Sequence, residues 1–324
     1  MEYRYLGDTG VQVSELCFGT MTFGGNADEE TSAALFHRCI EAGVNFFDCA
    51  NVYEKGYSEE ILGRLIKGRR DDLVITSKFG FPMGPGPNAS GTSRRHMMAS
   101  VEGSLKRLQT DYIDLYFIHR FDLNTPMEET LRVFDDLVSQ GKIRYPAVSN
   151  FAAWQIAKAL GISARQGWAR FECIQPMYSL VKRQAEVEIL PLAESEKLGV
   201  IPYSPLGAGL LTGKYGATRR PVGGRIAESA MYTKRYAAQS HYETAERFTE
   251  FARERGLEPA ALAVRWVANH PAVTSAIIGA RNLEQLEGSL KMVDIEMTPE
   301  TRAEISALSP APAVATDRAE ERTA

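Results

Sequence analysis

The sequence predicts an α/β protein with the architecture of a (β/α)8 TIM barrel. Strand and helix signals alternate from Leu16 onward, and eight short apolar strand segments can be recognised, whereas doubly wound sheets usually have fewer. No linker divides the 324 residues, so we expect a single barrel domain over residues 1–324, with a flexible tail over 310–324. The expected strands are Leu16–Gly19, Val44–Phe47, Leu73–Ser77, Ile113–Ile118, Ile143–Val148, Cys173–Pro176, Val200–Tyr203 and Ala276–Ile278.

A small β-hairpin is expected ahead of the barrel, over residues 3–13. Apolar residues that recur every three or four positions predict amphipathic helices between the strands. The clearest of these helices are Glu30–Ala42, Arg94–Leu108 and Glu128–Gln140. Two long loops, Gly84–Gly91 and Gly207–Arg225, follow predicted strands and are therefore expected at the C-terminal face of the barrel.

Three residues are predicted to mark helix ends. Ser93 precedes the helix Arg94–Leu108 as its N-cap, and Ser58 is predicted to cap a helix that begins just after Tyr57. Gly141 follows the helix Glu128–Gln140 and is suited to the left-handed conformation that often ends a helix.

Composition narrows the range of functions. The apolar share of 44% and the charged share of 24% are those of a globular protein, and a formal net charge of −4 gives no field for binding nucleic acid. No apolar run is long enough for a membrane helix, and the first residues do not open a signal peptide. The four cysteines lack metal-binding spacing. We therefore expect a cytoplasmic protein with reduced thiols, no metal, no nucleic-acid partner and no membrane partner.

Polar side chains gather where the predicted strands end. Asp48, Lys78, His119 and Asn150 each come just past an apolar run, and Tyr53 follows one loop after Asp48. Any one of them could be polar simply because solvent begins where a strand ends. Four at the same rim weakens that reading, because the C-terminal strand ends are where a TIM barrel carries its chemistry.

Asp48, Tyr53, Lys78 and His119 suit the reduction of a carbonyl group. A free phenol, with a pKa of roughly 10, is a poor acid near neutral pH, and a nearby ammonium is expected to lower that pKa. A carboxylate would hold the lysine in place, and an imidazole could orient the carbonyl oxygen. No side chain donates hydride, so a nicotinamide cofactor is implied.

The chain lacks the glycine-rich fingerprint of a Rossmann site, but a different cofactor cradle is predicted. Tyr203 could stack on nicotinamide, and the small residues that follow it suit a pyrophosphate. Arg281 lies at the start of a predicted helix, which favours a ribose phosphate and NADP over NAD. Taken alone, Tyr203 could equally be a core aromatic and Arg281 a solvated charge.

Several motifs distributed along the chain belong together. They are Phe47-Asp48-Cys49-Ala50 with Tyr53, Asp111–Tyr116 with Ile118-His119-Arg120, Val148–Phe151, Tyr203–Leu206 and Gly209–Lys214. With them, nearly the whole chain resembles the aldo-keto reductases. The loop Gly207–Arg225 resembles the branch of bacterial enzymes and potassium-channel β-subunits more than the aldose reductases.

The resemblance implies a role for each matched residue. Tyr53 would donate the proton, and Lys78 and Asp48 would adjust the acidity of Tyr53. His119 would orient a small-molecule carbonyl substrate. The implied cofactor is NADP(H), with NAD(H) as the alternative. The residues implied to bind it are Thr20, Met21, Asp48, Ser149, Asn150, Gln175 and Tyr203 at the nicotinamide, Ser204, Pro205, Leu206, Gly207 and Lys214 at the pyrophosphate, and Gly279, Arg281 and Gln285 at the adenosine 2′-phosphate.

Three departures from the family pattern lie outside the predicted catalytic residues. Pro146 lacks an N–H, so the fifth strand should lose a sheet hydrogen bond or begin late. Gly288-Ser289 stands where the family commonly has Glu-Asn, which weakens the prediction at the adenosine end. Ser179 replaces a common asparagine.

Three functions remain open on sequence grounds. The first is an NADPH-dependent reductase of aldehydes or ketones, monomeric or homo-oligomeric. The second is a cofactor-binding regulatory subunit with negligible turnover, and the third is an aldolase that forms a Schiff base at Lys78. The expected substrate pocket is largely aromatic and apolar, with candidates Met21, Phe23, Tyr53, Phe79, Phe81, Phe121 and Met231.

Overall fold

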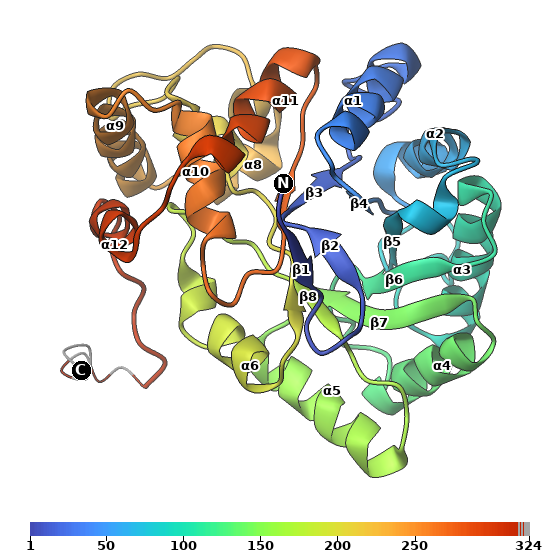
Figure 1. Cartoon of the computed structure of the whole chain (residues 1–324). Coiled ribbons are helices and arrows are strands. Elements are labelled where there is room, and N and C mark those ends of the chain that lie inside the picture. The colour runs from blue at the N-terminus through green and yellow to red at the C-terminus, as the bar shows by residue number, and fades with distance from the viewer. Residues whose placement is uncertain (317, 319, 321–324) are drawn as a thin grey trace.

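A parallel sheet surrounded by helices forms the core of the protein (Figure 1). The structure is a computed structural model that describes residues 1–316, 318 and 320. The eight strands lie in the order β10-β3-β4-β5-β6-β7-β8-β9. Their bounds are β3 Leu16–Gly19, β4 Phe46–Asp48, β5 Val74–Phe79, β6 Ile113–Ile118, β7 Ile143–Ser149, β8 Cys173–Gln175, β9 Gly199–Val200 and β10 Ala276–Ile278.

Backbone hydrogen bonds close this sheet into a barrel. The amide of Thr274 donates to the carbonyl of Val200 at 2.9 Å, and the amide of Ile277 donates to the carbonyl of Pro202 at 3.0 Å. These bonds join the β9 side of the sheet to β10, which itself pairs with β3. The predicted (β/α)8 fold is therefore confirmed.

Helices follow the strands and cover the outside of the barrel (Figure 1). The three clearest predicted helices are confirmed to within one residue at each end, as α1, α3 and α4. Ser93 caps α3 by accepting a hydrogen bond from the amide of His96, and Gly141 after α4 has a left-handed φ of 71°. The helices are α1 Glu29–Glu41, α2 Tyr57–Leu65, α3 Arg94–Leu108, α4 Met127–Ser139, α5 Ala153–Gln166, α6 Ile189–Ser195, α7 Arg225–Glu228, α8 Ala230–Arg235, α9 Gln239–Glu254, α10 Pro259–Ala268, α11 Leu283–Leu290 and α12 Pro299–Ala307.

The predicted hairpin closes one end of the barrel. It consists of β1 (Tyr3–Tyr5) paired antiparallel with β2 (Gln12–Ser14). Leu6 and Val13 of this hairpin are fully buried and join the side chains inside the barrel, which are Cys17, Phe46, Val74, Leu115, Phe117, Ala147, Cys173, Ile201 and Ile277. A Cβ on Gly7 would lie 2.5 Å from the amide nitrogen of Gly199, the first residue of β9, so only glycine permits this close approach. The hairpin therefore covers the end opposite to the C-terminal strand ends.

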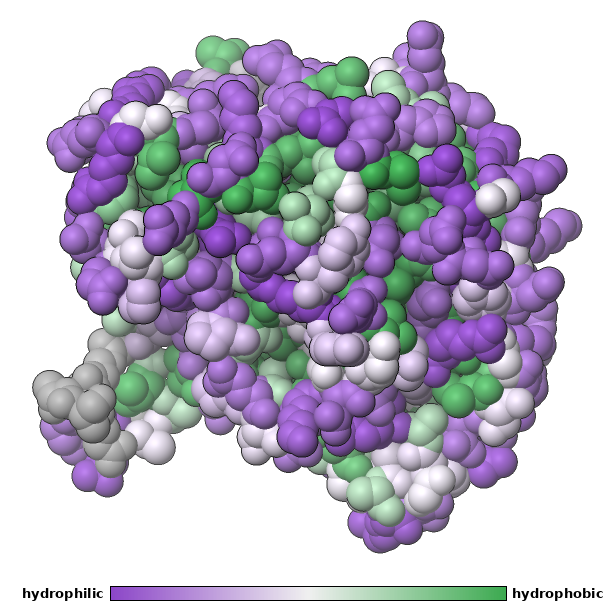
Figure 2. All heavy atoms as spheres, in the orientation of Figure 1, coloured by the Kyte–Doolittle hydropathy of each residue, from purple (hydrophilic) through white to green (hydrophobic). Residues whose placement is uncertain are grey.

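A second, larger apolar cluster lies between the sheet and the helices. Hydrophilic side chains cover most of the face that carries the hairpin, and hydrophobic ones lie between them toward its middle (Figure 2). Among the described residues, none of the helices combines the length and apolar character needed to cross a membrane. The four cysteines are buried and unpaired.

One local prediction is wrong, and another holds in one of its two alternatives. Ser58 is the second residue of α2, whose N-cap is Gly56, and its buried hydroxyl donates to the carbonyl of Thr20 at 2.8 Å. The hydroxyl is therefore used to anchor the neighbouring strand end instead of capping the helix. The fifth barrel strand does not begin late, since β7 continues through Pro146, whose carbonyl accepts from the amide of Glu172 at 3.0 Å. The proline removes one donor without interrupting the strand, so of the two predicted outcomes the lost sheet hydrogen bond is the one that holds.

Strand ends differ slightly from the prediction. β9 is shorter than expected and ends at Val200, while β5 extends to Phe79 and so includes Lys78. The predicted tail over 310–324 begins three residues after α12 ends, and residues 310–314 have no regular secondary structure. Part of that tail lies outside the described residues.

Candidate active site

A buried ion pair occupies the C-terminal end of the barrel interior. Asp48 is the last residue of β4, and Lys78 lies on the neighbouring strand β5. The Nζ of Lys78 donates to Oδ2 of Asp48 at 2.5 Å and to the carbonyl of Cys49 at 2.8 Å. It also donates to the hydroxyl of Tyr53 at 3.2 Å. Lys78 is fully buried, so all three contacts are made without exposure of the residue to bulk solvent.

The second oxygen of the carboxylate is held from β5 and β8. Oδ1 of Asp48 accepts from Oγ1 of Thr76 at 2.7 Å and from Nε2 of Gln175 at 2.8 Å. With Lys78 on Oδ2, the carboxylate is fixed in orientation. Thr76 was not among the predicted site residues. It could have been found, because it lies two residues before Lys78 and alternate residues of a strand share one face.

A strained turn presents Tyr53 to this ion pair. Tyr53 begins a short 3₁₀ turn, and its amide donates to the carbonyl of Ala50 at 3.1 Å. The next residues, Glu54 and Lys55, have left-handed φ values of 45° and 56°, and Gly56 follows with a φ of 101°. Left-handed residues other than glycine cost on the order of 1 kcal/mol each and tend to cluster at functional sites. The strain here lies directly beside the predicted proton donor.

The acidity of Tyr53 differs from the expectation. Burial raises the pKa of Tyr53 to about 12, and this outweighs the lowering by the Lys78 ammonium. The predicted lowering by the Lys78 ammonium is present, but it does not bring the pKa of Tyr53 below its ordinary value. The physical reason is that burial penalises the phenolate more than one ammonium stabilises it. Tyr53 consequently carries its proton at neutral pH.

Lys78 remains charged despite its burial. Burial alone lowers the pKa of Lys78, but the attraction of Asp48 and the contact with Tyr53 outweigh it and hold that pKa above its ordinary value. An amine must lose its proton before it can attack a carbonyl carbon. Lys78 is thus poorly suited to Schiff-base chemistry.

His119 faces Tyr53 from the end of β6. Its ring centroid lies 6.0 Å from that of Tyr53 and 4.6 Å from that of Phe81, and both pairs are nearly perpendicular. Burial, with the positive charges of Lys78 and Arg120, holds the pKa of His119 well below 6.5. The imidazole is therefore neutral at pH 7. Its Nδ1 is buried and has no hydrogen-bond partner among the described residues.

Four of the predicted cofactor residues lie together beside this site. Oγ of Ser149 donates to the carbonyl of Gln175 at 3.0 Å, and Nδ2 of Asn150 donates to the carbonyl of His119 at 2.9 Å. The hydroxyl of Tyr203 donates to Oδ1 of Asn150 at 2.7 Å. These contacts connect the ends of β6, β7, β8 and β9 into one polar group next to Asp48.

Thr20 and Met21 lie at the end of β3, next to β4. Thr20 is buried, and its Oγ1 donates to the carbonyl of Asp48 at 3.1 Å. Met21 is 39% exposed, so its side chain remains available for contact with a ligand.

The segment after Tyr203 forms a compact turn. Ser204 and Gly207 have left-handed φ values of 61° and 55°, and Gly207 opens the 3₁₀ turn Gly207–Thr212. Pro205 is buried and Leu206 partly buried, whereas Lys214 is exposed and its side chain has no hydrogen bond or ion pair in the part of the chain described here. Lys214 is the one cation of the predicted pyrophosphate group that remains free to bind an anion.

The predicted adenosine end lies at the N-terminus of α11. The amide of Arg281 donates to Oε1 of Gln285 at 3.1 Å, and Asn282 caps the helix. Gly279 follows β10, and a Cβ there would lie 3.6 Å from the carbonyl of Gly19. The guanidinium of Arg281 pairs with Glu228 of α7 at 3.3 Å. Sequence reasoning missed Glu228, because nothing in its local pattern links it to a residue 53 positions away.

Two of the residues expected in the aromatic pocket lie in the core instead. Phe23 and Phe79 are fully buried in the cluster between sheet and helices, and Phe79 stacks on Tyr116 at 5.0 Å. Both are core residues, so assigning them to the pocket was wrong. The remaining candidates, Met21, Tyr53, Phe81, Phe121 and Met231, are partly or largely exposed.

A closed parallel barrel with polar side chains converging at its C-terminal strand ends is the arrangement in which TIM barrels carry their functional sites. The sequence matches the model of the aldo/keto reductase family over residues 15–310, and the chain belongs to this family of oxidoreductases.

Three relatives show the breadth of the similarity. The chain is 38% identical to the uncharacterized oxidoreductase YrpG of Bacillus subtilis (strain 168), over 96% of this chain and 97% of the relative. It is 37% identical to a probable voltage-gated potassium channel subunit beta of Oryza sativa subsp. japonica, over 95% and 96%. It is 32% identical to L-glyceraldehyde 3-phosphate reductase of Escherichia coli (strain K12), over 91% and 88%. The predicted resemblance to bacterial enzymes and channel β-subunits is therefore confirmed.

Proposed function

We propose that this protein reduces aldehydes or ketones to alcohols with NADPH, with Tyr53 as proton donor. One observation carries the proposal: a protonated phenol contacts a buried ammonium, which is itself fixed by a carboxylate and a backbone carbonyl. That arrangement is suited to giving a proton to an oxygen and then stabilising the phenolate left behind. Its membership of a family of oxidoreductases agrees with this chemistry.

Each of the four residues has a separate role in the proposed reaction. Tyr53 gives its hydroxyl proton to the carbonyl oxygen of the substrate, and Lys78 stabilises the phenolate. Asp48 keeps the ammonium in place, and neutral His119 can donate one N–H to the same oxygen without adding charge. A bound reduced nicotinamide supplies the hydride.

The cofactor-facing residues fit such a group. The amide and hydroxyl groups of Ser149, Asn150 and Gln175 lie within one hydrogen-bonded set beside Asp48, where a carboxamide could exchange bonds with them. Arg281, at the N-terminus of α11, and the exposed Lys214 supply positive charge suited to phosphates. These features support NADP(H) over NAD(H).

A regulatory subunit with negligible turnover is the second candidate. It is favoured by relatives named as probable potassium channel β-subunits. Tight NADPH binding without turnover of any tested carbonyl would favour it over a reductase. The aldolase alternative is not retained, because Lys78 stays charged. A cytoplasmic location, and the choice between monomer and homo-oligomer, remain predictions.

Cofactor choice is the first measurable consequence. We expect oxidation of NADPH, seen as loss of its absorbance, with an activated aromatic aldehyde such as 4-nitrobenzaldehyde, and slower oxidation of NADH. Arg281→Gln should lower kcat/KM for NADPH by about 10- to 100-fold and leave that for NADH nearly unchanged, because only the 2′-phosphate needs the guanidinium. Glu228→Gln should favour NADPH, since it frees Arg281 from its ion pair.

The matched control is Arg255→Gln, which breaks the surface ion pair with Glu304 instead. It should change neither cofactor's kcat/KM. Equal losses for both cofactors in Arg281→Gln would contradict the assignment of this residue to the 2′-phosphate.

The pH dependence of the reaction follows from the two shifted pKa values. Burial raises the pKa of Tyr53 to about 12, and the pKa of His119 is well below 6.5. Neither group changes its charge near neutrality, so kcat for reduction should be nearly constant between about pH 7 and pH 9. Initial rates at saturating cofactor and aldehyde measure this. A bell-shaped profile with an apparent pKa near 7 would contradict the assignment.

A further inference from the structure

The turn that carries Tyr53 is fixed to β5 at its start. Two residues before Tyr53, the amide of Asn51 donates to the carbonyl of Lys78 at 3.0 Å. The turn then runs through consecutive left-handed residues and ends at Gly56, whose φ is 101°. Because a strained backbone persists only where the surrounding structure fixes it, the end of the turn must be held as well as its start.

Arg107 supplies the contact at the end of the turn, from the last turn of α3. A Cβ on Gly56 would lie 2.8 Å from Cδ of Arg107 and 2.9 Å from its Nε, so the arginine side chain lies directly against the buried glycine. The space beside the turn is thus filled by a side chain from another helix. The end of the turn cannot move toward Arg107 without displacing it.

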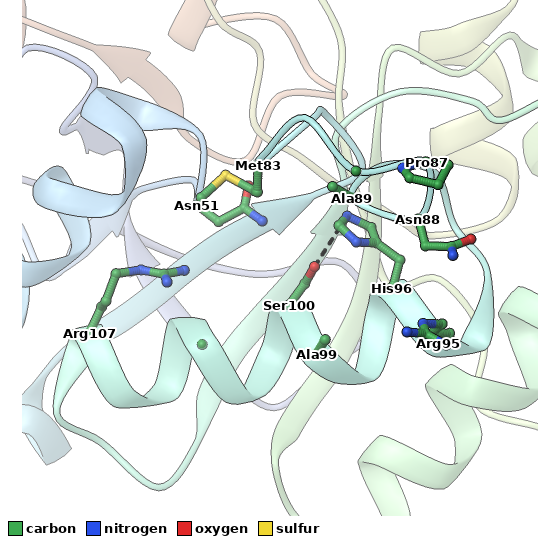
Figure 3. A pocket seen from close by; sticks show the side chains of 12 residues that line it. Asn51, Met83, Pro87, Asn88, Ala89, Arg95, His96, Ala99, Ser100 and Arg107 are labelled. Atoms are coloured by element: carbon green, nitrogen blue, oxygen red, sulfur yellow. Dashed lines mark hydrogen bonds between the residues drawn. The ribbon is translucent and has the colours of Figure 1, made fainter.

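Glu59, in the first turn of α2, holds Arg107 in this position. Its carboxylate is fully buried: Oε2 accepts from Nε of Arg107 at 2.6 Å, and Oε1 accepts from Oγ of Ser77 at 2.5 Å. Arg107 also lines a cavity of about 510 Å³ between α3 and the loop after β5 (Figure 3), so packing does not enclose it on every side. The charge-assisted bond to Glu59 therefore determines where the arginine side chain lies.

The same carboxylate is connected to both partners of the contact between Tyr53 and Lys78. Ser77 directly precedes Lys78 on β5, and Arg107 packs on Gly56, three residues after Tyr53. The hydroxyl of Tyr53 and Nζ of Lys78 are 3.2 Å apart, at the upper end of the usual hydrogen-bond range. A small displacement of the turn would therefore break this bond.

We propose that Arg107 and Glu59 are positioning residues for Tyr53. They hold the end of the strained turn, and so keep the hydroxyl of Tyr53 within reach of Lys78 and of a substrate carbonyl. They act through the turn and not on the substrate. The inference rests on the proposed function, because it concerns the geometry of the proton donor. Misplacing a reacting group by about 1 Å can lower a rate by about 100-fold.

Two double variants separate the contact with Gly56 from the ion pair. Glu59→Gln with Arg107→Ala, the alanine variant, removes both charges and the side chain that packs on Gly56. Glu59→Gln with Arg107→Met, the methionine variant, removes the same charges, but its unbranched side chain fills the space of the arginine as far as Nε. Because Glu59→Gln is common to both, neither variant leaves a buried carboxylate without its partner.

The alanine variant should lose activity that the methionine variant retains. At saturating NADPH, we expect kcat for 4-nitrobenzaldehyde to fall by about 10- to 100-fold in the alanine variant, while KM for the aldehyde changes by less than about threefold. The methionine variant should keep kcat within about threefold of the wild type.

Hydrogen exchange measures the turn itself, independently of activity. The amides of Tyr53 and Lys55 donate to the carbonyls of Ala50 and Val52 at 3.1 and 3.2 Å. In the alanine variant, peptides covering residues 50–57 should exchange these amide hydrogens at least about tenfold faster than in the methionine variant, as followed by mass spectrometry.

The matched control is a second ion pair that contacts the same strand. Arg70 and Asp114 form a partly buried pair at 2.6 Å, and the carboxylate also accepts from the amide of Ile75 near the start of β5. Asp114→Asn with Arg70→Ala removes the same charges and the same arginine side chain at the opposite end of that strand. It should lower the melting temperature and leave kcat unchanged.

Thermal unfolding shows whether each variant is folded. If the folded alanine variant keeps more than about a third of the wild-type kcat, the inference fails while the proposed function stands. Equal losses of kcat in the alanine and methionine variants would also overturn it, since charge and not contact would then be responsible. A loss of kcat in the control as large as in the alanine variant would show general destabilisation instead, and the inference would fail.

Two further results keep the test decisive. Should the alanine variant not fold, Glu59→Gln with Arg107→Val replaces it, because valine also ends before the two atoms that touch Gly56. If the wild type reduces no carbonyl, the proposed function fails, and hydrogen exchange alone then shows whether Arg107 holds the turn. Unchanged exchange in the alanine variant would overturn that as well.

Discussion

Replacing Asp48 by leucine is expected to lower the free energy of unfolding by about 3–5 kcal/mol. The change leaves the fully buried Lys78 ammonium with only the carbonyl of Cys49 and the hydroxyl of Tyr53, neither of which carries charge. It also removes the acceptor used by Thr76 and Gln175. Urea denaturation at pH 7 measures the loss.

The double variant Asp48→Leu with Lys78→Met separates charge from packing. Removing both charges leaves an apolar pair of similar volume, and replacing a buried ion pair in this way is often close to neutral. We therefore expect the double variant to recover most of the stability lost in Asp48→Leu, although it should not reduce carbonyls. Glu102→Gln with Lys142→Gln, at a surface pair, is the control and should cost less than about 1 kcal/mol. If the double variant loses as much unfolding free energy as Asp48→Leu and Lys78→Met lose together when measured singly, the two charges are not energetically coupled.

Tyr53→Phe is expected to lower kcat for carbonyl reduction by about 10²- to 10⁴-fold. The substitution removes one hydroxyl and keeps the ring, so the perpendicular contact with His119 and the packing of the turn remain. Lys78 keeps Asp48 and the carbonyl of Cys49 as acceptors. NADPH affinity, measured by quenching of protein fluorescence, should change by less than about threefold, because the loss concerns proton transfer alone.

Tyr57→Phe is the matched control for this prediction. It removes the hydroxyl of a neighbouring tyrosine, which donates to Glu29 at 2.9 Å on the surface. Its kcat should equal that of the wild type. If Tyr53→Phe keeps more than about a tenth of the wild-type kcat, another group supplies the proton and the proposed role of Tyr53 is wrong.

The barrel fold, and the convergence of polar residues at the ends of its strands, could be predicted from the sequence. Short apolar runs that end in Asp48 or His119 show which polar residues lie at the same level of the barrel, because parallel strands of one barrel must end at the same rim. The approach of Lys78 to Asp48 and Tyr53 was predicted from this alone, and the contacts are present.

What the sequence could not provide was burial and contacts between distant segments. The pKa of Tyr53 depends on how much solvent the surrounding loops exclude, which no local pattern reveals. Ser58 has the spacing of an N-cap but hydrogen-bonds to Thr20 instead, because the end of β3 lies beside it in the fold. Glu228 reaches Arg281 from a short helix inside a long loop.

The hairpin at the closed end of the barrel sets an order on folding during synthesis. Leu6 and Gly7 leave the ribosome long before Gly199, yet they rest against it, and the amide of Asp8 donates to the carbonyl of Lys197. At about 5–20 residues per second, these partners emerge roughly 10–40 s later. The apolar side chain of Leu6 thus waits for the seventh barrel strand, and chaperones that bind exposed apolar segments have that interval in which to act.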